Sequence, residues 1–355
     1  MTSGIDRRTL LRGLVGVVGG SLLAACGPSE RADSIEEPGA TAGASGSQAS
    51  PSAHEDLRVA FWSQPLAEQA NVYAAQEYGW FRDEGVELEF VPGAGGGDAI
   101  RQIIAGNADL AFANLEPMFF ALDQGVKLRA VYNIYPENVF NVISIHGHEM
   151  TRPENLRGKK VGIYSLASGT YHNLLVILRA AGLKETDLEI VATGINNFGP
   201  LLASQVDAQA ATDTGLFLAQ HQGLGDVDVI WARDYLNTPT DAFIVTEKTY
   251  QTRKEVIRRF LRAYKRGSQW MLEHPGEAAA LAQKYVTDGQ DVSRNLEVIK
   301  LRNASTLNAD TREHGLGWFN LDVLRQVEQA LFDLGLIKNR ITVDSVFTNE
   351  FIQDL

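Results

Sequence analysis

Apolar residues follow two spacings along most of this chain, and the two spacings alternate. Short apolar runs typical of strands are LRVAFW (57–62), VELEFV (86–91), ADLAFA (108–113) and LRAVYN (128–133). Segments with helical spacing lie between them at 67–81, 97–106 and 116–125. Strand–helix–strand alternation predicts an α/β fold in which mainly parallel sheets are flanked by helices.

The same order of elements recurs about a hundred residues further on. Residues 59–63 correspond to 161–165, residues 88–91 to 188–191, and residues 104–125 align without a gap on 202–223. Any two strand–helix units share some apolar pattern, but three matches in the same order favour a repeated lobe.

The repeat divides the folded part of the chain. We expect a first lobe at 57–140, a second lobe at 141–240, and a segment 241–355 that returns to the first lobe and braces it with helices. The crossings near Pro136 and Asp241 would then act as hinge segments.

The first residues follow neither spacing. Arg7 and Arg8 precede an uncharged run, Gly13–Ala25, and small residues lead into Cys26. A basic start followed by an apolar run too short to span a bilayer is typical of a secretory signal. The alternative, a buried helix, is disfavoured because four glycines in the run would weaken it.

Two short motifs refine this interpretation. LAAC (23–26) resembles a bacterial lipobox, and DRRTLL (6–11) resembles a twin-arginine export signal. The resemblance implies that residues 1–25 are a removed signal peptide. It also implies that Cys26 carries a lipid which anchors the exported protein to the outer face of the cell membrane. Whether export uses the twin-arginine or the general route stays open.

Composition predicts a flexible tether and argues against nucleic-acid binding. Residues 27–56 contain no aromatic residue and one large aliphatic, Ile35, so we expect 26–56 to be a flexible, lipid-anchored tether. The chain has 44 acidic against 32 basic residues, a net charge of −12, which argues against nucleic acid as a partner.

The sequence predicts neither catalytic residues nor a bound metal or cofactor. The single cysteine is already assigned to the lipid, and no Gly-x-Ser-x-Gly motif occurs. His146 and His148 flank a glycine in a predicted turn, with no cysteine or patterned carboxylates near them, so we expect no metal there.

The repeat nominates the ligand-binding loops, because ligands of open α/β sheets bind beyond the carboxyl ends of the strands. The loops are 62–64, 93–98 and 114–116 in the first lobe and 164–171, 194–198 and 212–214 in the second. Tyr135, an aromatic residue near the first crossing, is added to the residues of these loops. The candidate ligand-binding residues are Trp62, Ser63, Gln64, Asn114, Glu116, Tyr135, Tyr164, Ser168, Thr170, Tyr171, Asn196, Asn197, Thr212 and Asp213.

The chemistry of these loops favours a flat, uncharged ligand. None of the six contains lysine or arginine, which disfavours a small strong anion, and several carry aromatic residues suited to stacking. The amides of Gln64, Asn114, Asn196 and Asn197 offer paired donors and acceptors. Glu116 has two open roles, which are to accept a hydrogen bond from the ligand or to complement the dipole of a helix that starts beside Pro117.

The glycine-rich segment GAGGGD (93–98) follows a strand and precedes a helix, as a dinucleotide loop does, but it lacks the Gly-x-Gly-x-x-Gly spacing. We interpret it as a loop that lets a ligand approach the backbone closely.

From Leu57 onward the chain resembles the solute-binding proteins of ABC importers, in the branch related to thiamine-pyrimidine synthases. The resemblance is carried by Trp62 with Pro65, by 74–93, by 104–114 and by SVFTNEFI (345–352). One departure is that no Asn follows Pro65, where the branch often has Trp-x-Pro-Asn.

The resemblance implies a hinged, two-lobed periplasmic-binding-protein fold of type II. It implies a monomer that delivers a small molecule to a permease driven by an ATPase, and that performs no chemistry. Riboflavin is the favoured ligand, followed by the thiamine precursor formylaminopyrimidine and then by an alkanesulfonate, taurine or nitrate. The rival class is the synthase of the same fold, which would need a cysteine-rich segment beside a sacrificial histidine, whereas this chain has one cysteine.

Overall fold

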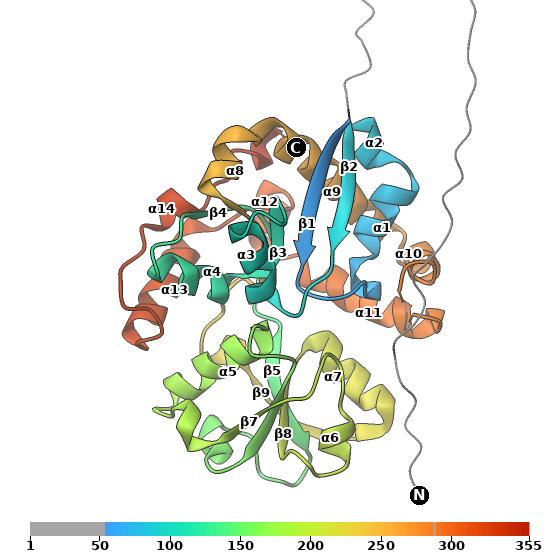
Figure 1. The fold of residues 1–355 in the computed structure, drawn as a ribbon. Helices are drawn as coiled ribbons and strands as arrows, with labels where there is room; N and C mark the ends of the chain where they lie inside the picture. Colours follow the sequence, from blue (N-terminus) through green and yellow to red (C-terminus); the bar gives the residue numbers. More distant parts are fainter. Residues whose placement is uncertain (1–53, 287–288, 355) are drawn as a thin grey trace, which may run out of the picture. The chain divides into compact units, whose positions relative to one another are not determined.

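Two five-stranded sheets organise the chain in the computed structural model, which describes residues 54–286 and 289–354 (Figure 1). The predicted signal peptide, Cys26 and nearly all of the predicted tether lie outside the described residues. The first sheet contains β1 (Glu55–Phe61), β2 (Val86–Val91), β3 (Leu110–Asn114), β4 (Leu128–Tyr135) and β10 (Asp241–Thr246). The second contains β5 (Phe140–Ile145), β6 (Lys160–Ile163), β7 (Glu189–Ala192), β8 (Ala208–Thr212) and β9 (Val227–Trp231).

Both sheets have the same topology. The strand orders are β2-β1-β3-β10-β4 and β7-β6-β8-β5-β9, and in each sheet one strand, β10 or β5, runs antiparallel to the others. The register is also repeated. Val59 pairs with Phe90 and Leu110, and Val161, its counterpart in the sequence repeat, pairs with the counterparts Ile190 and Ala208. The predicted α/β fold with mainly parallel sheets is confirmed.

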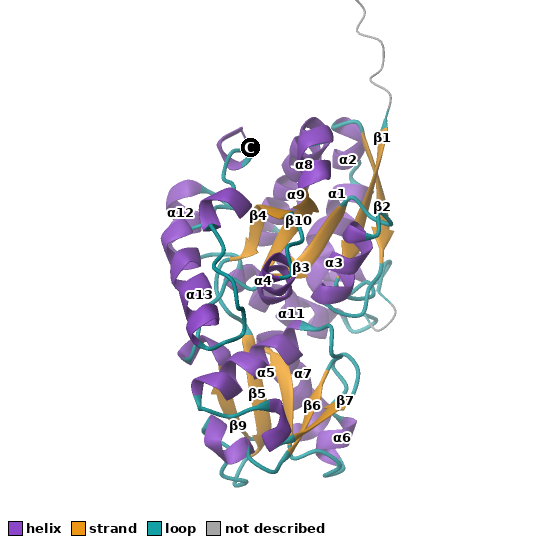
Figure 2. Ribbon diagram, turned by 60° about the vertical axis from the view of Figure 1, so that its left-hand side comes forward, coloured by secondary structure: helices purple, strands orange, loops and turns teal. Residues whose placement is uncertain are grey.

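Helices cover both faces of each sheet (Figure 2). The first sheet and its helices form what we call the first lobe: α1 (Ala70–Glu77), α2 (Trp80–Asp83), α3 (Gly96–Ile104), α4 (Leu115–Asp123), α8 (Glu247–Thr252), α9 (Lys254–Glu273), α10 (Pro275–Ala282), α11 (Val292–Ser305), α12 (Ala309–His314), α13 (Leu321–Asp333) and α14 (Val343–Val346). The second lobe has α5 (Gly169–Ala180), α6 (Gly199–Leu202) and α7 (Asp213–Ala219). No helix in the described ranges combines the length and apolar character needed to cross a bilayer.

Three boundaries differ from the sequence-based expectation. The first strand begins at Glu55 rather than Leu57, because Glu55 and Asp56 continue the ladder opposite β2. The helix expected over 67–81 is divided into a short 3-10 turn, α1 and α2, with a left-handed residue at Gly79 (φ 76°) before α2. The helical pattern of residues 250–273 likewise predicts one long helix, whereas the structure divides this region between α8 and α9 at Arg253, which has φ −127°.

The first sheet is buried on both faces because an apolar core lies against each of them. Neighbouring residues of one strand point in opposite directions and therefore enter different cores. Val59 and Phe61 enter a core with Phe243 and Phe260, whereas Ala60 enters a second core with Phe119 and Ile244. The segment after β10 supplies much of this covering, since Phe260 belongs to α9 and Leu331 of the second core belongs to α13.

The chain passes between the lobes twice, through segments 136–139 and 232–240. The two passages are bonded to each other. The Asn138 N–H donates to Oδ1 of Asn237 (2.8 Å), the Val139 N–H donates to Oγ1 of Thr240 (3.0 Å), and the Thr240 N–H donates to the carbonyl of Tyr135 (2.8 Å).

Candidate functional site

A cavity lies where the carboxyl ends of the parallel strands of the two lobes meet, enclosing about 650 Å³ when the open space at its mouth is counted. Its wall takes residues from the loops after β1, β2, β6 and β7, from β3 and β8 themselves, and also from the two passages and from α11. The cavity is lined by Trp62, Glu68, Gly95, Gly96, Asn114, Val139, Phe140, Tyr164, Ser168, Gly169, Thr170, Gly194, Ile195, Asn196, Phe198, Gln209, Ala210, Ala211, Thr212, Thr214, Thr240, Asp241 and Arg302.

Aromatic side chains make up much of the apolar wall. Trp62 and Tyr164 follow the equivalent strands β1 and β6, and Phe140 and Phe198 are almost fully buried in the second lobe. The Trp62 indole Nε1–H is buried and has no hydrogen-bond acceptor among the described residues. The cavity therefore offers ring faces for stacking.

Amides and hydroxyls supply the polar part of the wall. Asn114 Nδ2 donates to Oδ1 of Asp241 (2.5 Å), which joins β3 to β10, and Gln209 Nε2 donates to Oγ1 of Thr193 (2.8 Å). Ser168 caps α5 by accepting a hydrogen bond from the Tyr171 N–H (3.4 Å). These bonds fix the orientation of the side chains, so a ligand would meet a preformed set of polar groups.

The glycine-rich loop packs against the facing lobe. A Cβ on Gly95 would lie 2.5 Å from the carbonyl oxygen of Ala167. The Gly97 N–H donates to that carbonyl (2.9 Å), and the Ser165 hydroxyl donates to the carbonyl of Ala94 (2.6 Å). The close approach that the glycines permit is thus between two loops of opposite lobes, in addition to any approach of a ligand.

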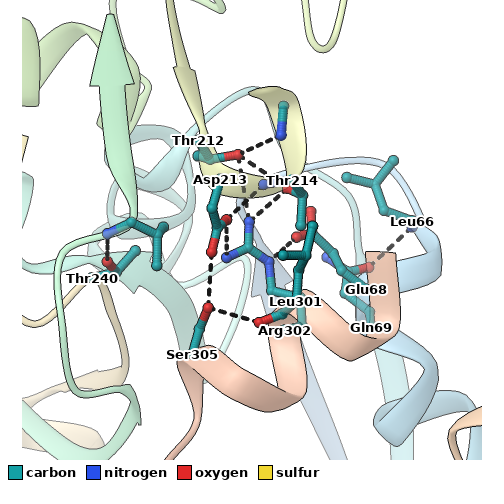
Figure 3. A network of polar contacts seen from close by, with 12 residues as sticks. Leu66, Glu68, Gln69, Thr212, Asp213, Thr214, Thr240, Leu301, Arg302 and Ser305 are labelled. Atoms are coloured by element: carbon teal, nitrogen blue, oxygen red, sulfur yellow. Dashed lines mark hydrogen bonds and ion pairs between the residues drawn. The ribbon is translucent and has the colours of Figure 1, made fainter. Parts of the chain in front are cut away.

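Arg302 is the residue that sequence reasoning missed most clearly. It is 2% exposed, and its guanidinium reaches Glu68, Asp213 and Thr214 (Figure 3). Nε donates to Oε2 of Glu68, Nη2 donates to Oγ1 of Thr214 (2.7 Å), and Nη1 forms a 2.9 Å ion pair with Oδ1 of Asp213 without the alignment of a hydrogen bond. Burial opposes the charge, but Asp213 and Glu68 outweigh it and raise the pKa of Arg302 above its ordinary value.

Two buried carboxyl groups lie near the passages. Burial raises the pKa of Asp241 from 3.8 to about 7, although Arg302 acts in the opposite direction. Burial raises the pKa of Glu116 from 4.5 to about 8, against the lowering effects of its own backbone N–H and of nearby Asn173. Neither carboxyl oxygen of Glu116 has a hydrogen bond of normal geometry among the described residues, so its protonated form is favoured at neutral pH.

The structure gathers half of the predicted ligand-binding residues in the wall of the cavity. These are Trp62, Asn114, Tyr164, Ser168, Thr170, Asn196 and Thr212. The other half lie outside the wall, namely Ser63, Gln64, Glu116, Tyr135, Tyr171, Asn197 and Asp213.

Several of the residues outside the wall have structural partners. Ser63 is fully buried and donates to the carbonyl of Gln64 (2.7 Å), and Asn197 Nδ2 donates to the carbonyl of Thr193 (2.8 Å). The Tyr135 ring lies under the guanidinium of Arg302, whose Cζ is 5.2 Å from the ring centroid. Tyr135 therefore contributes to the cavity through Arg302.

One signal in the sequence could have identified Arg302. The buried residues of α11 are Asn295, Val298, Ile299, Arg302 and Asn303, which recur at the spacing of one helix face. An arginine on the inward face of a helix needs a buried partner, and this marks it as a candidate for a site.

No group of three or more possible metal ligands occurs in the described ranges. Near the two histidines of the predicted turn, His146 Nδ1 lies 2.8 Å from Oδ1 of Asp228.

The two equivalent sheets with a cavity between them define the two-lobed periplasmic-binding-protein fold, and solved structures agree. The chain is similar to a protein from Bordetella bronchiseptica RB50 (TM-score 0.69, 20% identity, 84% of this chain and 96% of that chain). It is also similar to the periplasmic aliphatic sulphonate binding protein SsuA from Escherichia coli (TM-score 0.59, 18% identity, 84% and 99%).

Residues 67–278 match the NMT1/THI5-like family, and the chain belongs to this family. Its relatives include the riboflavin-binding protein RibY of Chloroflexus aurantiacus, which is 25% identical over 81% of this chain and 83% of the relative. They also include the formylaminopyrimidine-binding protein of Halalkalibacterium halodurans (23%; 60% and 66%). A 4-amino-5-hydroxymethyl-2-methylpyrimidine phosphate synthase of Saccharomyces cerevisiae is 22% identical (61% and 66%).

Proposed function

We propose that this protein is the ligand-capturing component of an ABC importer for a small, flat, aromatic heterocycle. The observation that carries the proposal is the cavity between the carboxyl ends of two equivalent sheets, whose wall combines Trp62, Phe140, Tyr164 and Phe198 with fixed amide groups. Such a wall suits the faces and the hydrogen-bonding edge of a ring system.

Riboflavin is the ligand that we favour. Its tricyclic ring needs a large stacking surface, which aromatic residues from both lobes supply. Its imide edge presents one donor between two acceptors, a pattern that Asn114, Asn196 and Gln209 can match. The similarity to RibY over most of both chains supports this choice.

Formylaminopyrimidine is the second candidate, and Asp241 is the observation in its favour. A carboxyl group that lines the cavity and is buried except toward it is a suitable partner for an aminopyrimidine. The amine of the ligand can donate to the carboxyl group, and the ring nitrogen can accept from its protonated form. The formylaminopyrimidine-binding relative supports this alternative. Alkanesulfonate, taurine and nitrate rank third.

The mechanism that we infer is closure of the two lobes around the ligand. Residues 136–139 and 232–240 would bend as hinges between lobes that extend over 57–140 with 241–355 and over 141–240. A ligand that contacts both lobes would stabilise the closed form. The closed protein, acting as a monomer and held to the outer face of the membrane by lipid on Cys26, would then dock on the permease.

The rival class is an enzyme of the pyrimidine synthase type. The wall of the described cavity contains neither histidine nor cysteine, and the only cysteine of the chain is the predicted lipid site. We therefore propose a receptor that performs no chemistry. A histidine altered in mass after incubation with candidate ligands would count for the enzyme.

Flavin fluorescence provides the test. The full chain, purified in detergent, should quench riboflavin fluorescence at submicromolar concentration. Trp62→Ala should weaken binding by about 5- to 150-fold, since an aromatic stacking partner contributes ~1–3 kcal/mol. Trp318→Ala is a matched control, because Trp318 lies outside the cavity wall. Absence of quenching together with calorimetric binding of formylaminopyrimidine or of a sulfonate would reassign the ligand.

A further inference from the structure

Arg302 joins the two lobes at the cavity. It belongs to α11 of the first lobe, and its partner Glu68 belongs to the same lobe, whereas Asp213 and Thr214 begin α7 of the second lobe. Ser305 of α11 strengthens the junction, because its hydroxyl donates to Oδ2 of Asp213 (2.9 Å). Figure 3 shows the guanidinium surrounded by these groups from both sides.

The charges at this junction do not favour an anion in the cavity. Arg302 is the only lysine or arginine among the residues that line the described cavity. Its charge faces two carboxylates, those of Glu68 and Asp213, so the local sum is negative. Asp241 lies in the same wall and adds a further acidic group.

The hydrogen-bonding capacity of Arg302 is also largely occupied. A guanidinium recognises a phosphate or sulfonate by presenting two parallel N–H donors to it. Here Nε is bonded to Glu68, and Nη2 is bonded to Thr214 and lies 3.4 Å from Oγ1 of Thr212. Nη1 makes no hydrogen bond among the described residues but forms the ion pair with Asp213. No edge of the fork remains fully free for an incoming anion.

We propose that Glu68 and Asp213 are specificity-determining residues, which neutralise and occupy Arg302 so that the cavity rejects anionic ligands and admits uncharged ones. For a flavin this means riboflavin rather than its 5′-phosphate. That choice of ligand rests on the proposed function, whereas the rejection of anions by the cavity does not. Glu68 and Asp213 act through Arg302 and are positioning residues rather than ligand contacts in this role.

Asp213→Asn and Glu68→Gln test the proposal because each removes one negative charge and keeps the shape of the side chain. The affinity for riboflavin 5′-phosphate relative to that for riboflavin should rise on the order of tenfold in either variant. Each variant removes one negative charge that would repel the phosphate from several ångströms away, and this repulsion is strong where the effective dielectric constant is low. A merely structural role would lower both affinities together and leave this ratio unchanged.

Ser305→Ala is the matched control. It removes a hydrogen bond to Asp213 without changing charge, and Ser305 does not line the cavity. The ratio of the two affinities should stay at the parent value in this variant. Circular dichroism of each variant checks the fold. The two charge variants alter different residues, so failure of one variant to fold leaves the other as a test.

The experiment is a fluorescence titration of the full chain in detergent with both flavins at constant ionic strength. A ratio that rises in Asp213→Asn or Glu68→Gln but not in Ser305→Ala supports the proposal. A ratio that stays at the parent value in both charge variants overturns it. So does a parent protein that binds the phosphate as tightly as riboflavin.

A second measurement does not depend on the flavin assignment. Ethanesulfonate should leave the thermal midpoint of the parent unchanged and should raise that of Asp213→Asn. If the parent binds neither flavin, the favoured ligand is wrong, but this shift still supports rejection of anions. Stabilisation of the parent by ethanesulfonate, or of neither protein, overturns the inference.

Discussion

A single methyl group at Gly169 should impair ligand binding by disturbing the contact between the lobes. Gly169 is the first residue of α5 and lines the cavity. A Cβ built there would lie 2.3 Å from Cζ of Phe140 and 2.7 Å from Oδ1 of Asn114. Phe140 belongs to the same lobe as Gly169, whereas Asn114 belongs to the other.

The geometry sets the size of the effect. Ordinary contacts between carbon atoms are about 3.5–4.0 Å, so the Phe140 ring or the α5 backbone must move by about 1 Å. Movement of the ring narrows the cavity, and movement of α5 separates it from Asn114. Overpacking of this kind costs ~1–3 kcal/mol, which corresponds to about a 5- to 150-fold loss of affinity if the cost falls on the closed form.

Gly276→Ala is the control, because Gly276 also lies in the first turn of a helix, α10, but a Cβ there meets nothing within 4 Å. It should stabilise the protein by ~0.5–1 kcal/mol without affecting binding. Riboflavin titration and urea unfolding of both variants measure the two effects. Binding by Gly169→Ala within about twofold of the parent, at unchanged stability, would refute the steric reasoning.

Two further predictions concern the anchor and the buried acid. Cys26→Ser should release the protein from membranes or block its maturation, and a mutant that fractionates and matures like the parent would count against lipidation. Because the folded pKa of Glu116, about 8, lies above its ordinary 4.5, its protonated form stabilises the fold. That stabilisation is complete below about pH 4.5 and is lost as the pH rises through about 8. Glu116→Gln should remove a few kcal/mol of this dependence. Urea unfolding near pH 6 and pH 9 measures it, and an equal change in parent and variant would contradict it.

The fold was predictable because local pattern and tertiary packing agree in this chain. VELEFV became β2 without a shift at either end, since an apolar run bounded by turn residues leaves few alternatives. The predicted ends of helices were wrong where the conformation of a single residue interrupts the helix. Gly79 interrupts a helical pattern by adopting a left-handed conformation, which periodicity alone does not reveal.

The candidate site was predictable only where it follows from the sheets. Trp62, Tyr164 and Asn114 line the cavity because they end or directly follow strands whose carboxyl ends meet there. Arg302 comes from a helix that begins more than two hundred residues after β1, and no strand rule places it. Glu68 was missed for a related reason. It lies in a short 3-10 turn, and its contribution to the site is its hydrogen bond with Arg302.

Selectivity in this molecule must come from the differences between its two equivalent halves. The repeat pairs Trp62 with Tyr164, and it sets Asn114 and Glu116 opposite Thr212 and Thr214. At the last pair, the first lobe buries an acid that is neutral at neutral pH, whereas the second lobe presents a hydroxyl to Arg302. A symmetric pair of lobes would offer the same groups to both edges of a ligand. The cavity therefore has two chemically different sides, because residues at equivalent positions differ and only one lobe supplies an arginine. Such a cavity can bind an asymmetric heterocycle in a single orientation.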